Sequence, residues 1–194
     1  MKKKILDLDV KNQQLQEKVT QITKYNNKTT NINNINGNVT NNTNTNNINI
    51  TVPFGEEDLT KISQEVCKSI FRKGFQSIVH FVKYVHFNPN LAENHNVLIS
   101  NLTDDYASIF TNDMKWSKIT KQEVIEKLID DKSGFLEEKY YELKKTLDNI
   151  TKKKFERFLD EQYNEKYVEQ LKNEIKLTLY NNKDIPQNTQ KLLK

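Results

Sequence analysis

The sequence is poor in the residues on which many functional sites depend. Its 194 residues include one cysteine, three histidines, four scattered glycines and three prolines. The single Cys67 excludes an intrachain disulfide and any zinc site built from cysteine pairs. The glycines form no phosphate-binding loop, and the few histidines suggest no Ser-His-Asp triad. We therefore expect a non-enzymatic protein with no cofactor and no bound metal.

Long apolar runs are also missing. No segment approaches the roughly 20 apolar residues that cross a bilayer. Asp7 and Asp9 interrupt the stretch that follows the basic start, so a secretory signal is not indicated. These features predict an intracellular protein without a membrane partner.

Excess positive charge is confined to the first part of the chain. Residues 1–50 carry seven lysines and three acidic residues, whereas residues 51–194 carry 23 basic and 23 acidic residues. Domains that bind a phosphate backbone usually carry a basic excess. The second part is therefore a poor candidate for binding nucleic acid.

Residues 1–25 show the heptad pattern of a parallel coiled coil. β-branched residues at a with Leu at d favour a dimer, an Asn at a fixes the register, and a final Ile at d leaves a trimer open. The alternative is a single amphipathic helix that lies on its own domain. Three heptads are marginal on their own, so we expect another segment to contribute. The predicted oligomerisation residues are Ile5, Asn12 and Val19 at a, and Leu8, Leu15 and Ile22 at d.

Residues 26–50 are dominated by asparagine, which supplies 13 of the 25 positions. Asn and Thr side chains compete for backbone hydrogen bonds, which disfavours a helix. One interpretation is a flexible linker with too little apolar surface to order itself. The other is an intersubunit β segment, because Ile48, Ile50 and Val52 alternate with polar residues.

Residues 51–183 are predicted to form an α+β domain that is mainly helical. The acidic residues Glu56, Glu57 and Asp58 suit the first turn of a helix, and Gly74 interrupts that helical pattern. The segments VLISN and YASIF indicate two short strands joined by a turn, and a further turn at 112–113 leads to Trp116.

Helical periodicity returns after the strands. Thr120 and Glu123 have the spacing of a capping box that opens a helix, and Ser133 and Gly134 are predicted to break it. Charged helices follow from residue 135. Pro186 is predicted to end the ordered part, which leaves residues 184–194 as a frayed tail.

Residues 86–96 are the only segment where side chains that can bind a metal gather. His86, Glu93 and His95 have donor atoms that suit several divalent ions. The alternative, which we favour, is structural: asparagines cap backbone ends and the histidines pack as amphipathic rings. The residues of this loop that we single out are His86, Asn88, Pro89, Glu93, Asn94 and His95.

Two further features are weaker candidates for function. Cys67 lies on an apolar helix face, where a buried thiol is usually inert. A basic cluster is a candidate for contact with phosphate, but interleaved acidic residues favour a solvated helical surface with ion pairs. Its members are Lys144, Lys145, Lys152, Lys153, Lys154 and Arg157.

The chain resembles an uncharacterised protein family of giant DNA viruses of the mimivirus type in four segments, which follow in the order NNTNTNNINITVPFGEEDLTKI, VHFNPNLAENHNVLISN, YASIFTNDMKW and KQEVIEKLID. The resemblance covers residues 41–131 closely and the remainder loosely. It implies an oligomeric viral protein, located in the host cytoplasm or viral factory. In that family a two-Cys two-His zinc finger and a coiled coil often precede this body. No such finger occurs in these 194 residues, so neither zinc binding nor finger-type DNA reading is carried over.

Three functional hypotheses follow. The favoured one is an oligomeric scaffold or adaptor that presents residues 51–183 to an unknown protein partner. The second is a nucleic-acid-associated viral protein that uses the Lys-rich arm and the basic cluster. The third is a metal-dependent enzyme at residues 86–95.

Overall fold

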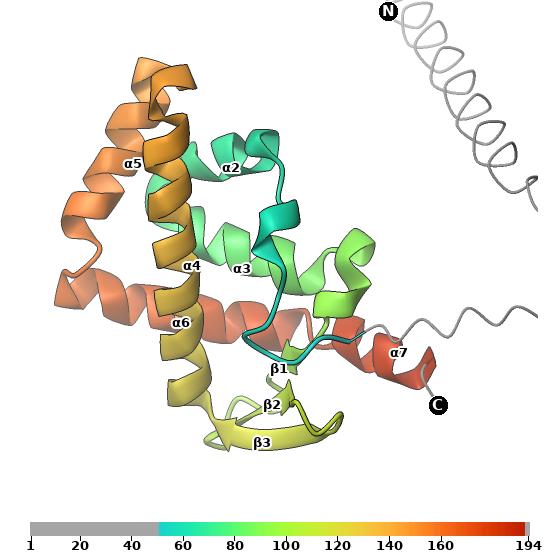
Figure 1. Cartoon of the computed structure of the whole chain (residues 1–194). Helices are drawn as coiled ribbons and strands as arrows, with labels where there is room; N and C mark the ends of the chain where they lie inside the picture. Colours follow the sequence, from blue (N-terminus) through green and yellow to red (C-terminus); the bar gives the residue numbers. More distant parts are fainter. Residues whose placement is uncertain (1–50, 193–194) are drawn as a thin grey trace, which may run out of the picture. The chain divides into compact units, whose positions relative to one another are not determined.

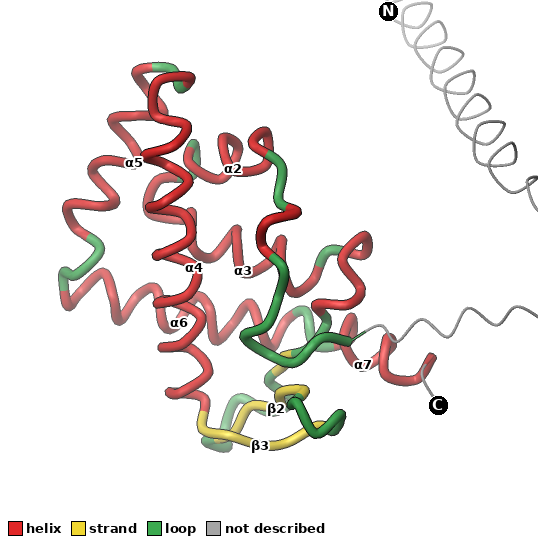
Figure 2. The backbone as a smooth tube through the Cα atoms, in the orientation of Figure 1, coloured by secondary structure: helices red, strands yellow, loops and turns green. Residues whose placement is uncertain are grey.

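The computed structural model describes residues 51–192, all of which belong to one unit of the chain, Asn47–Lys194. Their fold is mainly helical with a small antiparallel sheet, which confirms the predicted α+β class (Figures 1 and 2). The predicted oligomerisation residues Ile5, Leu8, Asn12, Leu15, Val19 and Ile22 lie outside the described residues, as does the stretch 26–50.

Polar capping residues define where most of the helices begin. Ser63, Thr120, Asp148 and Asn164 each accept a hydrogen bond from a backbone N–H in the first turn of the helix that follows. Thr120 and Glu123 form the predicted capping box. The helices are α2 (Gln64–Phe71), α3 (Ser77–Phe87), α4 (Lys121–Leu143), α5 (Asn149–Glu161), α6 (Glu165–Asn181) and α7 (Asp184–Leu192). Short 3-10 helices occupy Leu59–Lys61, Gly74–Gln76, Pro89–Asn94 and Lys144–Thr146.

Helix α4 continues through Ser133 and Gly134, so the break predicted there is wrong. An interior glycine costs a helix only about 1 kcal/mol relative to alanine. The buried side chains of Leu128 and Leu136 hold the helix against the core on both sides of the glycine. Ser133 turns its hydroxyl back onto the Ile129 carbonyl and so leaves the helix intact.

The helical core lies where α4 crosses α3 and α6, with the sheet at the N-terminal end of α4 (Figure 1). Aromatic rings fill the space between α2, α4 and α5. The Phe71 and Phe155 centroids lie 4.6 Å apart, and Tyr140 packs against both rings. Gly74 separates α2 from α3, as predicted, and its positive φ of 56° is one that glycine adopts readily.

The sheet has three antiparallel strands in the order β1 (Val97–Leu98), β2 (Tyr106–Phe110) and β3 (Trp116–Thr120). The first two confirm the predicted strand pair. The third was not predicted, because it passes directly into α4 without a turn. Thr120 serves both as the partner of Tyr106 in the sheet and as the N-cap of the helix.

The first described residues run across the domain as an extended segment. The Val52 N–H donates to the Glu93 carbonyl, and the Phe54 N–H donates to the Phe110 carbonyl, both at 2.8 Å. Val52, the last residue of the β segment that was one of the two interpretations of the sequence, is not part of a β-strand. The segment therefore ties the start of the domain to the Pro89–Asn94 helix and to the sheet.

Residues 184–192 form helix α7, so the predicted frayed tail is wrong for this part. Pro186 is the third residue of the helix, where the missing N–H removes no helical hydrogen bond. Its side chain is buried, and so is that of Thr189. Within residues 51–192, no helix is both long and apolar enough to cross a bilayer.

Candidate functional site

Residues 86–96 enclose a buried polar cluster rather than an open site. His86, at the end of α3, is fully buried, and its Nδ1 lies 2.9 Å from Asn96 Oδ1 and 3.3 Å from the Asn94 carbonyl. Both neighbours are acceptors, so we assign the proton to Nδ1. The other ring nitrogen, Nε2, is buried without a hydrogen-bond partner among residues 51–192.

The ion pair between Glu57 and Lys132 lies at the centre of this cluster. Glu57 Oε2 is 2.9 Å from Lys132 Nζ, and the two side chains are 2% and 1% exposed. Glu57 Oε1 accepts hydrogen bonds from Asn96 Nδ2 at 2.8 Å and from the Gly55 N–H at 2.9 Å. The carboxylate therefore joins the first segment of the domain to α4. The sequence placed Glu57 in the first turn of a helix, but the residue precedes the short helix Leu59–Lys61 and its side chain is buried.

Burial controls the protonation of these groups. Removal from water lowers the pKa of His86 to about 4, against a smaller opposite effect of Glu57. Protonation would also create a buried N–H at Nε2 without an acceptor among the described residues. Burial alone would raise the pKa of Glu57, but the charges of His86 and Lys132 and the Gly55 N–H lower it to about 2. At neutral pH the cluster thus holds a carboxylate, an ammonium group and a neutral imidazole.

His95 has a structural role of a different kind. Its Nε2 donates to the Asn88 carbonyl at 3.0 Å, and its Nδ1 lies 2.7 Å from the Thr189 hydroxyl on α7. Burial lowers the pKa of His95 below its ordinary value, which favours the neutral ring. Asn88 caps the Pro89–Asn94 helix by accepting from the Asn90 N–H. The capping and packing that we favoured for this loop are thus present.

The proposed metal ligands are not brought together. Among residues 51–192, no three His, Cys, Asp or Glu side chains are placed to hold a metal ion, and this applies to His86, Glu93 and His95. Both ring nitrogens of His95 have partners within the domain. The Glu93 carbonyl binds the Val52 N–H.

The basic cluster lies on the short helix Lys144–Thr146, which follows α4, and on α5. Acidic neighbours engage two of its six members: Lys144 lies 2.7 Å from Glu156, and Arg157 lies 3.1 Å from Glu161. The remaining members, Lys145, Lys152, Lys153 and Lys154, have no acidic partner within 4.0 Å among the described residues. Ion pairs therefore involve only two of the six members, and contact of the other four lysines with phosphate stays a prediction. Cys67 is buried, and burial raises the pKa of its thiol, as expected for an inert cysteine.

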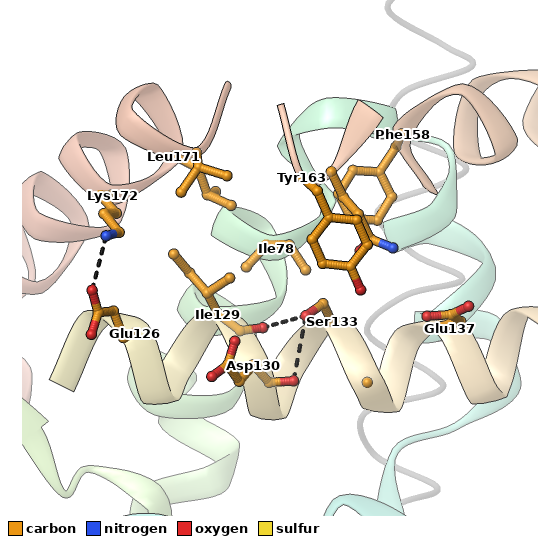
Figure 3. A pocket seen from close by; sticks show the side chains of 13 residues that line it. Ile78, Glu126, Ile129, Asp130, Ser133, Glu137, Phe158, Tyr163, Leu171 and Lys172 are labelled. Atoms are coloured by element: carbon orange, nitrogen blue, oxygen red, sulfur yellow. Dashed lines mark hydrogen bonds and ion pairs between the residues drawn. The ribbon is translucent and has the colours of Figure 1, made fainter. Parts of the chain in front are cut away.

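An open groove runs along α4, and we call it the α4 groove (Figure 3). Its volume is about 450 Å³. Apolar side chains from four helices form its floor, and Tyr163, which is 84% exposed, stands at its rim. The floor consists of Ile78 from α3, Ile129 from α4, Phe158 from α5, and Val168 and Leu171 from α6.

One face of α4 forms a wall of the groove. Glu126, Asp130, Gly134 and Glu137 follow one another at spacings of four, four and three residues, which places them on one side of a helix. From Glu126 to Glu137 this wall extends about 16 Å, at 1.5 Å per residue. A Cβ at Gly134 would meet no atom within 4 Å, so the middle of the wall carries no side chain and faces open space.

The groove is predominantly acidic. Three carboxylates line it, from Glu126, Asp130 and Glu137, against one ammonium group, Lys172. Lys172 Nζ lies 2.9 Å from Glu126 Oε1, and its hydrogen bond lowers the pKa of Glu126 (Figure 3). Within residues 51–192, neither Asp130 nor Glu137 has a basic partner within 4.0 Å. The groove can therefore accept a ligand that combines positive charge with an apolar surface.

Sequence analysis did not predict this groove. Its floor comes from residues that are far apart in the chain, and only the packing of α3, α4, α5 and α6 brings them together. One local signal was available. The spacing of Gly134 from Glu126, Asp130 and Glu137 places all four residues on one face of a helix. We instead interpreted the glycine as the end of that helix.

No protein-family model, curated protein or solved structure matches this chain. The resemblance to giant-virus proteins therefore stays a prediction from the sequence. The function has to be argued from the domain itself.

Proposed function

We propose that this chain is a non-enzymatic adaptor that displays the domain of residues 51–192 on an oligomeric stem. The domain would bind a protein partner through the α4 groove. The observation that carries this proposal is the contrast between two sites. The titratable cluster around Glu57 is closed to solvent, whereas the α4 groove is open and lined by apolar and acidic side chains.

The closed cluster supports a structural role. A general acid or base must come within hydrogen-bond reach of its substrate, and the side chains of Glu57, Lys132 and His86 are at most 2% exposed. Their hydrogen bonds instead connect the first segment, the loop of residues 86–96 and α4.

The open groove supports binding. Concave surfaces with an apolar floor and a few polar groups are the usual places for ligands and partners. Exposed tyrosines are frequent at protein interfaces, and Tyr163 stands at the rim.

Multivalency is the reason for joining such a domain to a coiled coil. Several copies on one stem raise the overall affinity for a partner without any new contact. The heptads of residues 1–25 and the resemblance to giant-virus proteins support this part of the proposal. The resemblance also supports placing the protein inside the host cell.

The solution mass by light scattering tests the proposal. We expect residues 1–194 to form a dimer or trimer, while residues 51–194 alone remain monomeric. Leu8→Ser with Leu15→Ser in the whole chain should give the monomer mass, because both changes fall at predicted d positions. If the unmodified whole chain is monomeric, multivalent display is wrong.

A further inference from the structure

We propose that the α4 groove binds an amphipathic helix of the partner protein, with two basic residues seven positions apart and an apolar residue between them. This inference rests on the proposed adaptor function and specifies the chemistry of the partner. It is argued from three properties of the groove: its charge, the spacing of its acidic residues and the open wall at Gly134.

Charge selects a basic partner. The carboxylates of Asp130 and Glu137 line the groove, and no basic residue among 51–192 lies within 4.0 Å of either. Lys172 is the one basic residue of the lining, and Glu126 engages it at 2.9 Å. A lysine or arginine from outside would therefore meet a carboxylate without displacing an existing ion pair.

Spacing selects a helix. Asp130 and Glu137 are seven residues apart on α4, which corresponds to about 10 Å along the helix axis. Residues seven apart on a second α-helix lie on one face at the same separation. A partner helix that lies along α4 thus brings two basic residues to the two carboxylates at once. An extended strand would need residues about three positions apart for the same distance.

Gly134 lets the partner approach closely. It lies between the two carboxylates, and nothing occupies the space within 4 Å of the position where its Cβ would stand. An apolar side chain of the partner, four positions after its first basic residue, would pass over this glycine. It would then reach the half-buried Ile129 on the floor of the groove. Helix-in-groove recognition generally uses anchors with this i, i+4, i+7 pattern.

The experiment uses the whole chain and a fluorescent helical peptide. The peptide carries two lysines seven positions apart, with a leucine four positions after the first. A second peptide of the same composition carries its lysines on opposite faces. Fluorescence anisotropy at low ionic strength measures both affinities. We expect the first peptide to bind more tightly than the second, and the difference to shrink as salt screens the charges.

Matched variants locate the binding site. Asp130→Asn with Glu137→Gln removes both carboxylates from the groove. Asp160→Asn with Glu138→Gln changes the net charge equally at exposed positions that do not line the groove. We expect the first pair of substitutions to lower the affinity for the peptide about fivefold to tenfold, which is the scale of two exposed ion pairs. The second pair of substitutions should leave the affinity unchanged. Asp130→Lys with Glu137→Lys should instead bind a peptide in which both lysines are glutamates.

Gly134→Gln tests the open wall without endangering the fold. Glutamine is a better helix former than glycine, so the melting temperature should not fall. The longer side chain should nevertheless obstruct the groove and so lower its affinity for the peptide. Equal affinity of the two peptides, or equal loss in both variant pairs, would overturn the proposal.

The oligomer and the partner are tested separately. If the whole chain is a dimer or trimer but binds both peptides equally, the adaptor proposal stands and this inference is wrong. A monomer that binds the first peptide selectively removes multivalent display but keeps the chemistry of the groove. If Asp130→Asn with Glu137→Gln lowers the solution mass, a second copy of this chain occupies the groove and the inference is wrong.

Discussion

Glu57 and Lys132, 75 positions apart in the sequence, form an ion pair of 2.9 Å in which both side chains are almost completely buried. Removing two charges from water is costly, and a buried pair of this kind needs further hydrogen bonds to compensate. Asn96 and the Gly55 N–H supply them to the carboxylate. The pair therefore serves mainly to fix the position of the first segment against α4.

Loss of one partner of this pair should destabilise the domain strongly. Lys132→Met leaves the Glu57 carboxylate buried without its counter-ion, which costs about 3–5 kcal/mol in comparable cases. Urea unfolding measures the effect. The control is Lys127→Met, because Lys127 forms an exposed pair with Asp131 at 2.9 Å, and such pairs contribute at most about 1 kcal/mol. A similar small loss for both variants would contradict a buried, fixed pair.

The double variant Glu57→Gln with Lys132→Met should cost less than the two single changes added together. In the double variant no unpaired charge remains buried, so the two positions are energetically coupled. Additive losses would show that the two side chains act independently.

Stability should fall as the solution is made acidic. The unfolded chain protonates His86 near the ordinary pKa of 6.5, whereas the folded domain resists protonation down to about 4. The contribution of His86 is thus complete above pH 6.5 and is lost as the pH falls to 4, in total about 3 kcal/mol. Glu57 acts in the same direction at lower pH, since its pKa falls from 4.5 unfolded to about 2 folded.

Urea unfolding midpoints measured across this pH range give the slope of stability against pH. His86→Gln should flatten it between pH 6.5 and pH 4, while the exposed His80→Gln should reduce it less. An unchanged slope in His86→Gln would show that another group titrates.

Gly134→Ala should stabilise the domain by about 0.5–1 kcal/mol, because alanine favours the helix and its Cβ meets nothing. Thermal unfolding measures the gain. Gly55→Ala is the opposite control. Its φ of 92° strains any other residue, and the new Cβ would stand 2.6 Å from Lys127 Cε. A loss of stability in Gly134→Ala would mean that the glycine is needed for packing.

Thr189→Val should loosen helix α7. The valine cannot hydrogen-bond His95, which lies 2.7 Å from the Thr189 hydroxyl, and loss of such a bond costs about 1 kcal/mol. Hydrogen exchange should become faster in residues 184–192. Thr178→Val on α6 is the control, since that hydroxyl bonds only within its own helix, to Glu174. Equal exchange in both variants would contradict a tie between α7 and His95.

Local signals in the sequence predicted local structure well. The capping box at Thr120 and the interruption at Gly74 depend on residues within one turn of each other, and both are present. Gly134 misled the prediction, because packing on both sides of it outweighs a cost of about 1 kcal/mol. β3 and α7 were missed for different reasons. β3 pairs with its neighbour β2 but passes directly into α4 without a turn that would mark its end, whereas α7 packs on His95, which is distant in the sequence.

The candidate sites were harder to predict than the fold. The sequence identified residues 86–96 as unusual and favoured a structural role for them, but it did not show that Glu57 and Lys132 join the same cluster. Nor did it show the α4 groove, whose floor combines Ile78, Phe158 and Leu171. These residues are far apart in the sequence and follow no periodic pattern, so only the folded domain shows that they lie together.

The separation of Glu57 from Lys132 also sets an order of events during synthesis. A ribosome adds about 5–20 residues per second, so Glu57 leaves it roughly 4–15 s before Lys132 does. During that interval the carboxylate has no Lys132 to meet, and the sheet and the first half of α4 are made only in its later part. The beginning of the domain therefore cannot reach its final place until Lys132 of α4 has been made.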